Sequence, residues 1–212
     1  MSQLDWREDE TLTAQLRVMS RRQRNQAAYL ALRRLQAPLL RIAMPADWGV
    51  APAVVDSLIL SGEAQMGGEN DGALRLAIAE LCAAPLFESE IEPEFAESFQ
   101  LEAINGWLVF GDALGEMGEV QAGGLIGLAR ELADYLDKSM ENSLAVAEHF
   151  ISNGLGYFGT RNLEVESICH GGILTAPENE VAASSEVGRQ LLDVCDEYSN
   201  QLASVLIKFP KD

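Results

Sequence analysis

Residues 120–153 read VQAGGLIGLARELADYLDKSMENSLAVAEHFISN and hold the longest regular pattern in the chain. Apolar residues recur in this stretch every three or four positions, close to the period of an α-helix. They are Leu125, Leu128, Leu132, Leu136, Met140, Leu144, Ala147 and Ile151. Asn153 and Gly154 then form a typical helix end. The spacing predicts one long helix, with an apolar face that must pack against other helices.

Shorter helical patterns flank this segment. They predict helices over about 13–44, 52–64, 72–84, 93–114 and 184–208, which makes about six in all. We expect Pro38 to end or kink the first helix near residue 37. Pro52 and Pro93 suit the first turns of their helices, and Asn70 or Asp71 is expected to cap the third. The late part of helix 93–114 is apolar nearly all round, so this helix is expected to be central and buried.

Residues 154–177, GLGYFGTRNLEVESICHGGILTAP, contain five glycines and little helical period. They predict a long glycine-rich loop over 154–180, and long loops in compact domains often carry function. Residues 1–12 are expected to be flexible. The remaining patterns include no strong strand and no internal repeat. We therefore predict an all-α fold in which residues 1–212 form a single domain of packed, mostly antiparallel helices.

Charge is distributed unevenly along the chain. The formal net charge is −18, yet residues 1–41 hold eight arginines against four acids. Residues 76–129 contain ten acids and no lysine or arginine. A basic helix in so acidic a chain is expected to dock on acids of its own chain or of a second copy. The overall field argues against direct nucleic-acid binding and against binding to lipid headgroups.

The acidic segment predicts a surface for a basic protein partner, because complementary charge raises the rate of encounter. An acidic surface that only keeps the protein soluble is the alternative. The residues expected to meet the partner are Glu88, Glu90, Glu92, Glu94, Glu97, Glu116 and Glu119.

Few residues could support catalysis. His149 and His170 are the two histidines, and Cys169 beside His170 is the one adjacent thiol and imidazole. Neighbouring side chains usually point apart, and the local sequence lacks the signatures of catalytic cysteines. The carboxylates and histidines also lack the spacing typical of a di-metal helical bundle. We therefore predict no catalytic residue, no metal site and no cofactor, and expect a protein without enzymatic activity.

Localisation follows from composition. The first residues, MSQLDWREDETLT, are polar and acidic, unlike a secretory signal, and no run of about 18 apolar residues occurs. The three cysteines Cys82, Cys169 and Cys195 have irregular spacing and do not suggest a disulfide framework. We expect a cytoplasmic protein that does not interact with membranes.

Three hypotheses for function follow. The first is an acidic protein-interaction module of the immunity or antitoxin type, which inhibits a basic partner protein. The second is a helical ligand-binding protein or enzyme, with a pocket near Trp107–Gly115. The third is a homo-oligomer in which the basic first helix of one copy docks on the acidic segment of another.

Overall fold

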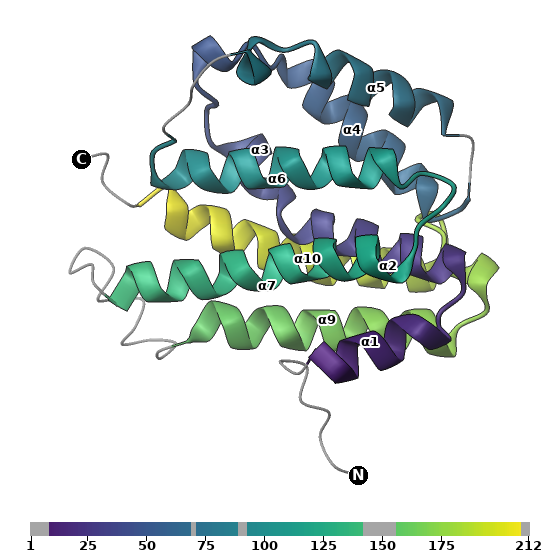
Figure 1. Cartoon of the computed structure of the whole chain (residues 1–212). Coiled ribbons are helices and arrows are strands. Elements are labelled where there is room, and N and C mark those ends of the chain that lie inside the picture. The colour runs from purple at the N-terminus through teal and green to yellow at the C-terminus, as the bar shows by residue number, and fades with distance from the viewer. Residues whose placement is uncertain (1–8, 69–70, 89–92, 142–155, 209–212) are drawn as a thin grey trace.

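The computed structural model describes residues 9–68, 71–88, 93–141 and 156–208, and these residues form α-helices and no strand (Figure 1). The predicted all-α fold is confirmed, but nine helices are present in the described residues in place of about six. They are α1 (Asp9–Val18), α2 (Arg21–Arg34), α3 (Gln36–Arg41), α4 (Pro52–Gln65), α5 (Gly72–Cys82), α6 (Phe95–Asp112), α7 (Glu119–Glu141), α9 (Tyr157–Thr175) and α10 (Glu186–Leu206). Short 3-10 turns, η1 (Ala46–Trp48), η2 (Pro85–Phe87) and η4 (Glu178–Glu180), lie between some of them.

Helix α2 is the central element of the fold. It contacts α7, α9 and α10 on one side and α4 and α6 on another. Its last two turns are buried nearly all round, because Ala27, Ala28 and Ala31 let neighbouring helices approach closely. Helix 93–114, predicted to be central and buried, packs as α6 against α2, α3, α5 and α7, but it is not buried on all sides. Helix α6 buries one face against the core, while Val109 on its other face is exposed.

The predicted first helix, 13–44, is three helices. Ser20 ends the first piece and caps the next, since its hydroxyl accepts a hydrogen bond from the Gln23 backbone N–H at 3.1 Å. The Gln23 side chain in turn accepts from the Ser20 N–H at 2.9 Å. The second break falls at Leu35, two residues before the predicted one, because Pro38 has no N–H to donate to the Arg34 carbonyl. Residues 9–12, expected to be flexible, belong to α1.

The helices at residues 52–64 and 72–84 are confirmed with slightly shifted ends. Asp71 is the N-cap residue of α5, although its side chain makes no capping hydrogen bond. Pro93 lies just before the N-cap residue of α6 and not in its first turn, because the helix starts at Phe95. Helices α4 and α5 form a layer above α2 in Figure 1, and α6 packs against α5 and α2.

The loop predicted over 154–180 is largely helix α9. Its buried face consists of Phe158, Asn162, Val165, Glu166, Cys169, His170 and Ile173. Three of these positions are occupied by Asn, Glu and His, so the apolar residues alone do not show a helical period. The glycines also fit inside the helix, and at Gly172 an added Cβ would lie 2.9 Å from the Leu191 side chain. The sequence pattern failed here because part of the inward face is polar.

Helices α7 and α10 match their predictions over the described residues. In α7, Leu125, Leu132, Leu136 and Met140 are buried. The predicted continuation to residue 153 lies outside the described residues, as do Leu144, Ala147, His149 and Ile151. Helix α10 begins after Ser185, whose hydroxyl accepts from the Gly188 N–H at 2.9 Å.

Candidate functional site

The predicted partner-binding acids do not form one cluster. Glu88 and Glu94 are exposed and Glu97 is half-buried near the start of α6, while Glu116 and Glu119 are exposed beyond its end. Helix α6 has 18 residues and so separates the two groups by about 27 Å. Glu90 and Glu92 lie outside the described residues.

Three of these acids have structural partners. Glu94 and Glu97 form a reciprocal capping box at the start of α6, and the Glu97 side chain accepts from the Glu94 N–H at 2.9 Å. The Glu119 carboxylate lies 3.7 Å from Arg24 and 3.8 Å from Arg17. Glu88 and Glu116 have exposed side chains. These two are therefore the described members of the predicted set that remain open to a partner.

The arginines of the N-terminal segment mostly bind the protein itself. Arg33 forms a bidentate pair with Asp196, at 2.5 and 2.7 Å, and a further ion pair with Glu63 at 3.1 Å. Arg41 donates to the Asn200 side chain at 3.1 Å. The expected docking of the basic segment on the protein's own polar groups is thus observed, and it removes positive charge from the surface.

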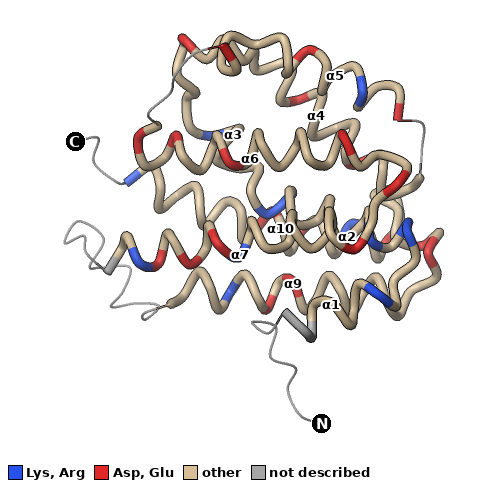
Figure 2. Tube along the Cα trace, viewed as in Figure 1, with Lys and Arg blue, Asp and Glu red and all other residues tan. Residues whose placement is uncertain are grey.

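Most charged residues of helices α4, α5 and α6 are acidic, and we refer to the described residues between 52 and 112 as the acidic layer (Figure 2). Arg75 is the one basic residue in this range, and it pairs with Asp71 at 3.1 Å. Exposed acids include Asp56, Glu80, Glu88, Glu94 and Asp112. The acidic layer also exposes the apolar side chains of Leu60, Leu76, Phe87 and Val109.

A buried ionic cluster joins α2, α7 and α9. The fully buried Glu166 carboxylate accepts two hydrogen bonds from Arg130, at 2.5 and 2.9 Å. Arg34, 2% exposed, lies 3.7 Å from the same carboxylate and donates to the Asn162 side chain at 2.7 Å. No sequence pattern predicts this cluster, because its residues lie far apart in the chain and resemble ordinary surface charges.

Cys169 and His170 contact different residues in the structure. The Cys169 sulfur lies 3.6 Å from the sulfur of Cys195, and this contact lowers the Cys169 pKa, while burial raises that of Cys195. The His170 ring nitrogen Nδ1 lies 2.8 Å from the Gln15 side-chain oxygen. Burial lowers the His170 pKa to about 4, so the imidazole is neutral at pH 7. All three side chains are enclosed in the core.

The predicted pocket near Trp107–Gly115 is only partly correct. Trp107 and Phe110 are core residues, packed against the Tyr29 ring with centroid separations of 6.2 and 6.3 Å. Gly62 allows this packing, because an added Cβ would lie 2.5 Å from Trp107 and 2.7 Å from Tyr29. Gly115, at the other end of the predicted range, lines a separate pocket.

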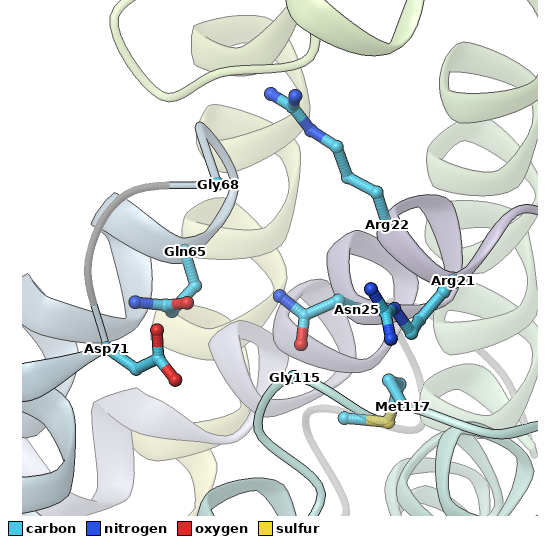
Figure 3. Close-up of a pocket in the computed structure, with 8 residues that line it drawn as sticks. All are labelled: Arg21, Arg22, Asn25, Gln65, Gly68, Asp71, Gly115 and Met117. Carbon is cyan, nitrogen blue, oxygen red and sulfur yellow. The ribbon is translucent and has the colours of Figure 1, made fainter.

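This pocket has a volume of about 300 Å³ and lies where the start of α2 meets the end of α4 and the α6–α7 connection (Figure 3). Its lining residues are Arg21, Arg22, Asn25, Gln65, Gly68, Asp71, Gly115 and Met117. In Figure 3, Gln65 and Asp71 point toward each other on one side, opposite Asn25 and Arg21. The pocket brings together three separate chain segments, and no sequence motif marked it.

Among the described residues, His, Cys, Asp and Glu side chains form no group of three that could hold a metal ion. No helix in the described ranges is long and apolar enough to span a membrane. The chain matches no protein-family model, no curated protein and no solved structure.

Proposed function

We propose that this protein is an acidic interaction module that binds a basic partner protein through the acidic layer. The observation that supports the proposal is the charge balance of residues 52–112, in which the single basic side chain is paired with Asp71. Unpaired positive charge would weaken attraction to a basic surface. Such a layer attracts that surface over roughly a Debye length, about 8 Å at physiological salt.

The apolar side chains of the acidic layer favour a protein partner over a purely solubilising role. Leu60 and Leu76 are 72% and 63% exposed, and Phe87 and Val109 are 41% and 43% exposed. Protein interfaces combine apolar contacts with a polar rim, and charge complementarity then sets specificity and on-rate. An inhibitor of the immunity or antitoxin type has this physical character. The cytoplasm is the location that we propose for such a complex.

The test begins with a basic protein that the chain captures from lysate. That protein is purified, and its rate of association is then measured with two matched triple variants of the chain. The first variant is Glu80→Lys, Glu88→Lys and Asp112→Lys in the acidic layer. The control is Glu131→Lys, Glu180→Lys and Asp193→Lys, which replaces three exposed acids outside the acidic layer. Both variants change the net charge by the same amount.

We expect the first variant to slow association at least tenfold at low salt and the control to have a much smaller effect. High salt should reduce the difference between them, because exposed charges are screened. Equal association rates for the two variants would refute the acidic layer as the binding surface. Measurement of the molecular mass of the protein alone in low and high salt tests the homo-oligomer hypothesis separately.

A further inference from the structure

We propose that the pocket shown in Figure 3 binds a small metabolite with an anionic group, a phosphate or a carboxylate, at one end and hydroxyl donors at the other. Arg21 and the first turn of α2 would receive the anion. Asn25, Gln65 and Asp71 would receive the hydroxyl groups. This inference does not depend on the proposed protein partner.

The walls of the pocket are held in place by arginines that donate to backbone carbonyls. Arg22 Nη2 donates to the Gly67 carbonyl at 2.8 Å, which fixes the end of α4 against α2. Arg24 Nε donates to the Met117 carbonyl at 3.2 Å, and Arg75 Nη2 donates to the Leu114 carbonyl at 3.3 Å. These bonds fix the α6–α7 connection from both sides. The cavity is therefore preformed, which lowers the entropic cost of binding.

Arg21 is different from these arginines. Within the described part of the chain, it makes no hydrogen bond or ion pair, and its side chain is exposed at the pocket. It lies at the first position of the 14-residue helix α2, where backbone N–H groups and the helix dipole also favour an anion. A guanidinium group matches carboxylate and phosphate oxygens in a two-point geometry. In a chain with a net charge of −18, an arginine that makes no ion pair with the described residues provides local positive charge for an anionic ligand.

Hydrogen-bond acceptors line the pocket both beside Arg21, one helical turn further along α2, and across from it. The Asn25 side-chain oxygen is buried and has no hydrogen-bond partner among the described residues. A buried polar atom of this kind costs free energy unless a donor reaches it. The Asp71 carboxylate is paired with Arg75 at 3.1 Å, so its charge is partly balanced and repels an anionic ligand less. Hydroxyl donors of a ligand would satisfy both residues.

The size of the cavity restricts the ligand. A volume of about 300 Å³ is at the lower end for small-molecule sites. Gly68 and Gly115 both line it with left-handed backbones, at φ 74° and 80°, where side chains are disfavoured. An added Cβ at Gly115 would meet no atom within 4 Å, so the space beside it is open. A phosphorylated or carboxylated polyol of a few carbons fits these limits.

In the experiment, the full chain is titrated with three probe compounds, and binding is measured by NMR and calorimetry. Glycerol 3-phosphate has both ends, inorganic phosphate has the anion alone, and glycerol has the hydroxyls alone. We expect glycerol 3-phosphate to bind most tightly, with a Kd of about 1 mM or below, inorganic phosphate to bind more weakly, and glycerol not to bind. Arg21→Gln should weaken glycerol 3-phosphate binding at least fivefold, whereas the exposed Arg189→Gln on α10 should not.

Asn25→Ala provides a second test, since it should weaken glycerol 3-phosphate and leave inorganic phosphate unchanged. Arg21 is exposed and makes no hydrogen bond or ion pair with the residues that the structure describes, so Arg21→Gln is expected to fold normally. The proposal is overturned if no probe binds up to about 10 mM, a concentration that would reveal even a weak site. It is also overturned if Arg21→Gln and Arg189→Gln weaken binding equally, or if phosphate binds as tightly as glycerol 3-phosphate.

Discussion

Replacing Glu166 by glutamine should strongly destabilise the protein. The Glu166 carboxylate is fully buried and balances two arginines, of which Arg34 is 2% and Arg130 is 15% exposed. Glutamine has the same shape but no charge, so the positive charge of Arg34 would remain in the core without its counterion. Removal of one partner from a buried ion pair costs about 3–5 kcal/mol. This is a large fraction of the roughly 5–15 kcal/mol that stabilises a folded protein.

Urea unfolding followed by far-UV circular dichroism measures this loss. With a slope of about 2 kcal/mol per molar urea, the midpoint should fall by about 2 M. Glu164→Gln is the matched control, because Glu164 lies on the same helix and its ion pair with Arg161 is exposed. That change should cost less than about 1 kcal/mol.

A double variant distinguishes buried charge from lost packing. Arg34→Met together with Glu166→Gln removes the stranded charge, so it should recover at least about 1 kcal/mol relative to Glu166→Gln alone. Arg130 is partly exposed and can turn its guanidinium toward water. If Glu166→Gln proves no more destabilising than Glu164→Gln, the reasoning that this cluster is a desolvated ionic centre is wrong.

Three further predictions concern the core. In the native protein, Ellman's reagent should react only with the exposed Cys82, whereas Cys169 and Cys195 should react only after unfolding. Rapid reaction of more than one thiol in the folded protein would contradict the burial of these two cysteines. The pKa of His170 falls from about 6.5 in the unfolded chain to about 4 in the folded protein. As the pH drops between these two values, the unfolded state binds a proton before the folded state does, so the free energy of unfolding should fall by about 3 kcal/mol. Stability curves measured from pH 7 to 4 should therefore be steeper for the natural protein than for His170→Asn, and parallel curves would argue against a neutral buried imidazole. Gly62→Ala should lower the thermal midpoint, because the new Cβ meets the Trp107 and Tyr29 rings. In Gly127→Ala on α7 the new Cβ meets no atom within 4 Å, so this variant should raise the free energy of unfolding by about 0.5–1 kcal/mol. Differential scanning calorimetry of the two variants tests this, and equal effects would contradict the close packing at Gly62.

The helical class, most of the helix positions and the charge asymmetry could all be predicted from the amino-acid sequence. Helices such as α7 and α10 have one apolar face, and their period is visible because neighbouring residues along the chain set it. The Ser20–Gln23 capping box is also local, because its two residues are three positions apart in the chain. The lack of bases in residues 76–129 is likewise a property of the chain alone.

Tertiary structure decided which of these features are buried and what they contact. Helix α9 was hidden because Asn162, Glu166 and His170 occupy core positions, and only partners from α1, α2 and α7 make those positions tolerable. Arg34 and Arg130 look like surface residues until the fold brings Glu166 between them. The pocket has the same origin, because Arg21, Gln65 and Gly115 come from separate segments. Burial and contact depend on residues far apart in the chain, and local sequence patterns do not contain that information.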